Sequence, residues 1–277
     1  MKAAAKLSQA ALYLFLALAA AMTVVPYYWM ISTSLKSAAE VVRVPPTLFP
    51  TEPRWHNYID AIVQAPLLTY VRNNLIVGMA TVTTSTFVSV LAAFAFARLR
   101  FRAKNFLFFV VLSMMMIPQE MLIITNFQTI AHWGWMNTWE ALIVPYCVNP
   151  FNIYLLRQTF MQVPDELYQA AKVDGLTNFR YLTSIVLPLS KSAVVTTLIL
   201  SMIVIWHTFA WPNLVTTQDS LRLVSNGLQN AFTSSVGTIA YELQMAAAAI
   251  VTLPLIIMFL LLRKQVLSGM IRGGIKG

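Results

Sequence analysis

Six long apolar segments alternate with polar segments along the 277 residues of this chain. Each apolar segment is close to or above the roughly 20 residues that a helix needs to cross the hydrocarbon of a bilayer. The pattern therefore predicts an all-α integral membrane protein with one transmembrane domain, residues 1–277. The six predicted spans are residues 10–33, 73–97, 105–127, 141–162, 192–212 and 243–262.

The first apolar segment allows two interpretations. Lys2 and Lys6 precede it, and Ala17, Ala19 and Ala21 resemble the small residues of a signal-peptide cleavage site. The apolar run continues well past these alanines, however, and exceeds the core of about 7–15 residues that a signal peptide carries. We therefore expect this segment to be retained as the first span.

Prolines and polar residues interrupt two of the predicted spans. Pro118 and Glu120 fall in the third, and Pro145, Asn149 and Pro150 fall in the fourth. Irregular backbone persists at membrane depth only where it is buried in protein or faces a water-filled cavity. The broken parts of these two segments are therefore predicted to be buried in protein or to face a water-filled cavity.

The composition excludes an ordinary soluble domain, because 58% of the residues are hydrophobic and only 10% are charged. The net charge of +9 would suit a nucleic-acid partner, but cations also gather on the cytoplasmic side of membrane proteins. With a cytoplasmic N-terminus, six spans place 14 of the 19 Lys and Arg residues in the cytoplasm. The charge pattern thus predicts a membrane protein with both termini in the cytoplasm and no nucleic-acid partner.

Several kinds of chemistry lack the residues they need. Cys147 is the single cysteine, and the chain has only three histidines, so neither a disulfide nor a cysteine- or histidine-rich metal site is expected. No glycine-rich phosphate loop occurs, which argues against ATP binding by this chain. We therefore expect no catalytic residue, no metal and no cofactor bound by the chain itself.

The polar stretch 164–188 is predicted to begin with a short helix. Pro164 suits the first helical turn, and Asp165 and Glu166 place negative charge at the positive end of the helix dipole. Gly175 lies where a helix would end in a left-handed residue. The expected helix therefore runs from about Pro164 to just before Gly175.

One side of this helix is expected to be low and flat. Glu166, Ala170, Ala171 and Asp174 share that side at 3.6 residues per turn. Small alanines between two acids would let the surface of another protein approach closely, with Ala171 facing the partner and Lys172 facing solvent. A capped loop helix with no partner has the same spacing, so the pattern alone leaves both interpretations open.

The same residues resemble a known motif. The pattern Glu166-x3-Ala170-Ala171-x2-Asp174-Gly175, followed by Ile185-x-Leu187-Pro188, is similar to the EAA loop of permease subunits in ABC importers of the carbohydrate uptake class. Weaker similarities are the Ser-Leu-Lys segment at 34–36, Asn73, the basic turn after Arg98, and a glycine–lysine tail. The tail residues are Gly273, Gly274 and Lys276.

The resemblance implies an assembly in the bacterial inner membrane, in which this chain spans the membrane several times, forms part of the solute pathway and transmits motion from the ATP-binding subunits. The loop helix would dock in a cleft of an ATP-binding subunit dimer, which binds ATP and Mg²⁺, and the tail would reach the same subunits. The other implied partners are a second permease subunit, an extracytoplasmic solute-binding protein and membrane lipid. Seven residues would carry the coupling: Glu166, Ala170, Ala171, Asp174, Gly175, Leu187 and Pro188.

Six polar or aromatic residues are candidates for a solute path. Amides, imidazoles and aromatic faces suit hydroxyl-rich solutes, but each residue could equally serve helix packing. Glu120 has its own alternative, because an acid beyond Pro118 could reach the membrane surface instead of lining the path. The candidates are Glu120, Asn149, Asn152, Trp206, His207 and Trp211.

The predicted function is therefore that of an importer permease for a sugar or sugar-like solute. Glycerol 3-phosphate and related phosphodiesters are the nearest alternative solutes. An ion-coupled secondary transporter is the main rival from another class, but it would need several intramembrane acids or an internal repeat. A membrane-embedded enzyme would need a nucleophile–base pair or metal ligands within the spans. We find the residues for neither.

Overall fold

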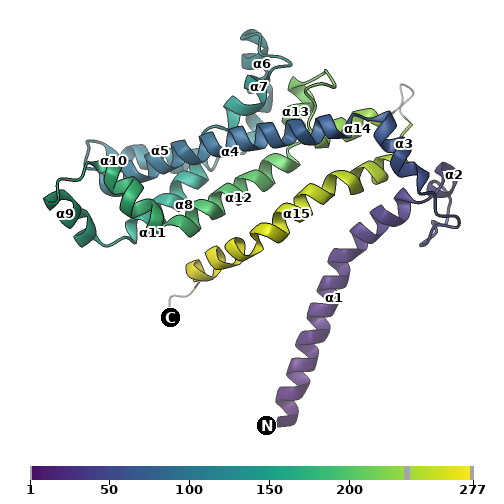
Figure 1. Ribbon diagram of the computed structural model, residues 1–277, viewed down its shortest axis with the longest axis horizontal. Helices are drawn as coiled ribbons and strands as arrows, with labels where there is room; N and C mark the ends of the chain where they lie inside the picture. Colours follow the sequence, from purple (N-terminus) through teal and green to yellow (C-terminus); the bar gives the residue numbers. More distant parts are fainter. Residues whose placement is uncertain (1, 234–237, 275–277) are drawn as a thin grey trace. The chain divides into compact units, whose positions relative to one another are not determined.

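The computed structural model describes residues 2–233 and 238–274. These residues form helices and connecting segments, and their only β-type pairing is an isolated bridge between Thr233 and Ile239 (Figure 1). The prediction of an all-helical fold is confirmed for the described part of the chain. A helix pairs its backbone N–H and C=O groups within one segment. The hydrocarbon interior of a membrane requires this, because it holds no water to bond those groups.

The helices belong to two compact units, residues 1–67 with 227–256 and residues 68–226 with 257–277. The first unit contains α1 (Lys2–Ser34), α2 (Ala38–Val41), α3 (His56–Gln64) and the first part of α15 (Tyr241–Gly274). Helix α14 (Val224–Ala231) crosses from the second unit to the first. The second unit contains α4 (Leu67–Arg98), α5 (Lys104–Met114), η1 (Gln119–Leu122), α6 (Ile123–His132), α7 (Trp139–Ile143), η2 (Val144–Tyr146), α8 (Pro150–Met161), α9 (Asp165–Val173), α10 (Asn178–Tyr181), η3 (Leu182–Val186), α11 (Leu187–Leu189), α12 (Lys191–His207) and α13 (Ala210–Val215).

Two of the described helices are long and apolar enough to cross a membrane, namely the Ala11–Ser34 part of α1 and all of α4. Two more segments meet that test only as bent pairs. Helices α5 and η1–α6 meet at 85°, and α10–α11 meets α12 at 81°. The predicted span 141–162 is divided among α7, η2 and α8, with breaks at its prolines. The number of spans is therefore between two and four by this measure, and six spans stay a prediction.

In the first unit, polar contacts fold the loop between α1 and α3. Lys36 is 2% exposed, and its amine donates to the Thr47 carbonyl at 2.5 Å. Glu40 accepts from the Thr47 hydroxyl at 2.8 Å and the Thr51 N–H at 3.0 Å. These hydrogen bonds lower the pKa of Glu40, and the bond from Thr47 contributes most. Trp55 and Tyr58 also stack in this loop, but the polar side chains fix its path.

In the second unit, a hydrophobic core joins the polar stretch 164–188 to two of the long apolar helices. Burying a large apolar side chain stabilises a fold by about 1.5–3 kcal/mol, so this shared core fixes α9 and α10 against α4 and α8. Its buried members are Val90, Ala93 and Phe94 of α4, Leu156 and Phe160 of α8, Ala171 of α9, and Tyr181, Leu182 and Val186.

Candidate functional site

The predicted loop helix is α9. The sequence pattern predicts that it begins at Pro164, one residue before its start in the structure. It begins at Asp165, directly after Pro164, and carries Asp165 and Glu166 in its first turn. Both carboxylates lie near the unpaired N–H groups of that turn, where negative charge is stabilising. Neighbouring residues in the sequence therefore determine where α9 begins.

The C-terminus of α9 is closed by Gly175 in the left-handed conformation, with φ of +74°. The Gly175 N–H donates to the Lys172 carbonyl at 3.1 Å, and the Leu176 N–H donates to the Ala171 carbonyl at 2.8 Å. These two bonds form a Schellman motif, whose left-handed position favours glycine. The prediction of a positive φ at Gly175 is confirmed.

The inner face of α9 is formed by Tyr168 and Ala171. Ala171 is 3% exposed and belongs to the core shared with α4 and α8. Tyr168 packs edge-to-face on Tyr181 at 5.0 Å, and its hydroxyl bonds the Asn178 side chain at 3.1 Å. The expectation that Ala171 faces a docking partner is therefore wrong, because this residue is buried inside the chain's own core.

The outer face of α9 is a stripe of four exposed residues, Glu166, Ala170, Val173 and Asp174, which we call the α9 stripe. It lies opposite Tyr168 and Ala171 at the helical spacing. Val173 is 88% exposed, and the sequence reasoning missed it. Its position seven residues after Glu166, on the same face, was the signal that could have found it.

Arg98 is the second site residue that the sequence did not reveal. The sequence marked it only as the start of a basic turn. Its side chain is only 5% exposed, and its guanidinium forms an ion pair with Asp165 at the start of α9. The same guanidinium donates to the carbonyls of Phe160, at 2.7 Å, and of Val163. Charge-assisted bonds of this kind are stronger than neutral ones, so Arg98 fastens the end of α4 to α8 and α9.

The remaining predicted coupling residues, Leu187 and Pro188, lie in α11, directly after the π-helical turn η3. Leu187 packs against the shared core, whereas Pro188 is exposed. At the other predicted contact, Gly273 and Gly274 lie in the last turn of α15. Lys276 lies outside the described residues.

Asn149 and Asn152 meet at the start of α8. The Asn149 side chain accepts from the Asn152 N–H at 3.2 Å and so caps the helix. The Asn152 side chain is buried, with the residue 1% exposed, and donates to the Ser201 hydroxyl of α12 at 2.9 Å. In this structure the Asn149 side chain therefore caps α8, and the Asn152 side chain joins α8 to α12.

The other candidates for the solute path differ in exposure. Trp206 and Trp211 are buried, and the Trp211 indole donates to the Ala141 carbonyl at 2.8 Å. Glu120 is exposed in the bend between α5 and α6, and His207 is exposed at the end of α12, where its ring bonds the Ile203 carbonyl at 2.8 Å. Glu120 and His207 are therefore the two exposed candidates, whereas Asn149 is half-buried. Among the described residues no cluster of His, Cys, Asp and Glu suits a metal ion.

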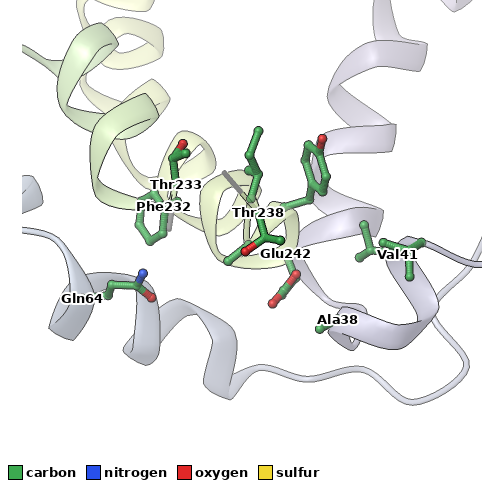
Figure 2. Close-up of a pocket in the computed structure, with 11 residues that line it drawn as sticks. Ala38, Val41, Gln64, Phe232, Thr233, Thr238 and Glu242 are labelled. Atoms are coloured by element: carbon green, nitrogen blue, oxygen red, sulfur yellow. The ribbon is translucent and has the colours of Figure 1, made fainter. Parts of the chain in front are cut away.

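Figure 2 shows a separate pocket of about 330 Å³ within the first unit. Helix α2, Gln64, residues 232–233 and residues 238–242 line it, and Glu242 is the one acidic residue among them. The Gln64 amide donates to the Ala231 carbonyl at 3.2 Å, which joins α3 to the segment before α15. None of the predicted site residues lines this pocket.

Comparison with known proteins places the chain in a family. Residues 61–272 match the family described as binding-protein-dependent transport system inner membrane component. A trehalose/maltose transport system permease protein of Thermococcus litoralis is 33% identical, over 91% of both chains. An sn-glycerol-3-phosphate transport system permease protein of Brucella abortus is 27% identical, over 94% of both.

A solved structure supports the fold. One chain of a bacterial ABC transporter involved in the import of the acidic polysaccharide alginate superposes with a TM-score of 0.81, covering 94% of this chain and 96% of that chain at 20% identity. The chain therefore belongs to the binding-protein-dependent inner-membrane component family. It is a permease subunit of an ABC importer and an inner-membrane protein.

Proposed function

We propose that this permease forms half of the translocation pathway for a sugar or sugar-like solute and is driven through the α9 stripe by a dimer of ATP-binding subunits. The observation that carries the proposal is the construction of α9. One face is buried in a core shared with α4 and α8, and the opposite face presents small, acidic and apolar residues to solvent. A helix held in this way can transmit a displacement of the ATP-binding subunits to α4 and α8 as a rigid body.

The mechanism follows from the contacts of α9. Closure of the ATP-binding dimer displaces the docked helix, and ATP with Mg²⁺ is bound and hydrolysed on those subunits, with no cofactor on this chain. Because Arg98 and the shared core join α9 to the ends of α4 and α8, these helices move with it. Such a rigid-body displacement opens the pathway on one side of the membrane and closes it on the other.

The proposed assembly has the composition implied by the sequence. A second permease subunit supplies the other half of the pathway, and a solute-binding protein delivers the solute from outside. Six spans with both termini in the cytoplasm place the α9 stripe, and the residues after Gly273, on the side of the ATP-binding subunits. The cation distribution supports this topology.

A pair of bulky substitutions tests the α9 stripe. Ala170→Trp places a large side chain in the middle of the stripe, whereas Lys172→Trp places it on an exposed flank of the same helix. We expect Ala170→Trp to reduce copurification of the ATP-binding subunits, or to leave ATP hydrolysis without uptake, while Lys172→Trp behaves like the parent. Equal behaviour of the two variants would show that the stripe is not the docking surface.

The class of solute is supported by the trehalose/maltose relative and by the charge of the predicted path. Its only charged member is Glu120, and an acid would repel the phosphate of the alternative solute, glycerol 3-phosphate. Uptake by the reconstituted importer should therefore be tested over a panel of neutral sugars and phosphorylated glycerol. Stimulation of ATP hydrolysis by glycerol 3-phosphate alone would reverse the assignment of the solute.

A further inference from the structure

The loop between α4 and α5, residues 99–103, has a fixed shape. Ala103 adopts a left-handed φ of +59°. The Lys104 amine donates to the carbonyls of Leu99, at 3.0 Å, and of Ala97, at 3.3 Å. These two bonds occupy carbonyl groups at the C-terminus of α4, which a cation stabilises. The loop is therefore held against the end of α4.

This loop encloses an open cavity of about 400 Å³ whose lining includes Leu99, Arg100, Phe101, Lys104, Asn105 and Phe106. No acidic residue lines it. Arg100 and the neighbouring Arg102 are exposed, and neither forms an ion pair with a described residue. The loop consequently presents positive charge that the described part of the chain does not neutralise.

The surrounding charges reinforce one another. Burial, followed by the nearby Arg157, Arg100 and Arg98, lowers the pKa of Lys104. The carboxylate of Asp165 is already paired with Arg98. A bound anion would relieve the repulsion between these cations.

Aromatic side chains continue from the charged loop along α5. Phe101 is 40% exposed, and Phe106 and Phe109 are each 65% exposed one helical turn apart. Helix α5 is apolar from Phe106 onward. A ligand that fits this surface has an anionic head for the loop and an apolar body for α5, which is the chemistry of a phospholipid.

We propose that the α4–α5 loop binds the phosphate headgroup of an anionic phospholipid, with Arg100, Arg102 and Lys104 around the phosphate and the acyl chains along Phe106 and Phe109. Arg98, the last residue of α4, also binds Asp165 of α9, so the bound lipid lies beside the residue that fastens the coupling helix. The proposal requires a membrane protein but does not depend on the solute or on the docking role of α9.

The test compares lipid retention by the assembled importer, purified with mixed phosphatidylglycerol and phosphatidylcholine. Native mass spectrometry counts the lipids that stay bound. A double variant, Arg100→Gln with Arg102→Gln, removes the two exposed loop cations and leaves Lys104 to hold the end of α4. The matched control, Lys172→Gln with Arg180→Gln, removes two exposed cations elsewhere in the second unit.

We expect the parent importer and the control to retain phosphatidylglycerol in preference to phosphatidylcholine. The loop variant should lose about tenfold or more of that preference, because each cation near an anionic membrane contributes about 1 kcal/mol. Arg100→Lys with Arg102→Lys keeps the charge and should keep the preference, which separates binding from misfolding.

Four outcomes would overturn the proposal. The first is equal retention of both lipids by the parent, and the second is equal loss of lipid from the loop variant and from the control. The third is loss of ATP-binding subunits, rather than of lipid, from the loop variant. The fourth is displacement of the lipid by millimolar inorganic phosphate. The third would identify the loop as a protein contact, and the fourth would identify a site for free phosphate. Because lipid retention is measured without transport, failure here leaves the proposed transport function standing.

Discussion

Helices α6 and α9 end in the same backbone motif. Gly134 follows α6 with φ of +72°, and Gly175 follows α9 with φ of +74°. At the end of α6 the Gly134 N–H donates to Ala131 at 3.1 Å and the Trp135 N–H to Ile130 at 3.0 Å, matching the two bonds at α9. At either glycine an added Cβ would meet no atom within 4 Å. The two helix ends are therefore locally equivalent.

Their surroundings differ. On either side of Gly134, Trp133 and Trp135 pack edge-to-face at 5.1 Å. The Asn137 side chain then accepts from the N–H groups of Thr217, at 2.6 Å, and Gln218, at 3.2 Å, after α13. Beyond Gly175, by contrast, Leu176 packs on the apolar core that holds Ala171.

The comparison shows that the helix end itself does not specify the function. The end of α6 is tied to a neighbouring loop by polar bonds, and we expect it to have a structural role. Helix α9 is held by apolar contacts on one face and by Arg98 at its first turn. This arrangement leaves the α9 stripe exposed, so perturbing α9 should affect coupling, whereas perturbing the end of α6 should affect stability alone.

The largest effect is expected from Arg98→Met, which removes the guanidinium that joins α4, α8 and α9. The carbonyls of Phe160 and Val163 lose a charged donor, worth about 1.5–3 kcal/mol per bond. We expect uptake to fall by about tenfold or more, since about 1.4 kcal/mol corresponds to a factor of ten, while ATP hydrolysis continues. Both rates are measured on the reconstituted importer.

Asp165→Asn is the control for Arg98→Met. It removes the ion pair but keeps the two bonds from Arg98 to backbone carbonyls. Because the Asp165 side chain is 79% exposed, the pair contributes at most about 1 kcal/mol, and uptake should fall much less. A loss as large as that of Arg98→Met would show that the ion pair, rather than the backbone bonds, joins the helices.

An intermediate effect, confined to stability, is expected from Asn137→Gly. Glycine tolerates the φ of +57° at this position, so the change removes the side-chain bonds without adding strain. The N–H groups of Thr217 and Gln218 lose their acceptor, which should cost about 1–2 kcal/mol and lower the thermal midpoint of the purified complex. Coupled uptake lost at an unchanged midpoint would contradict the structural role assigned to the end of α6.

The smallest and most selective effect is expected from the matched pair Gly134→Ala and Gly175→Ala. Both residues have a left-handed φ and open space at the Cβ position, so each alanine adds the same strain of about 1 kcal/mol. The two thermal midpoints should fall equally. Only Gly175→Ala should raise the ATP hydrolysed per solute imported, by at most about fivefold for that energy. If both glycines change this ratio alike, the difference between the two ends is not functional.

The sequence was sufficient for the features that depend on nearby residues. The acids at 165 and 166 and the glycine at 175 predicted where α9 begins and ends to within one residue, because caps act on backbone groups within one turn. The breaks in the segment 141–162 followed from Pro145 and Pro150, because proline lacks the N–H that a helix interior needs. The EAA-like loop also identified the family that the comparison with known proteins shows.

The tertiary structure alone decided which side of α9 faces inward and what holds the helix. Spacing groups Glu166 with Ala170 and Asp174, but small residues lie on both faces, so hydrophobicity does not show that Ala171 is buried. Arg98 and Asp165 are 67 positions apart, and no local pattern connects them. The pairing exists because the ends of α4 and α8 meet in one core, which only the packing of the folded chain brings together.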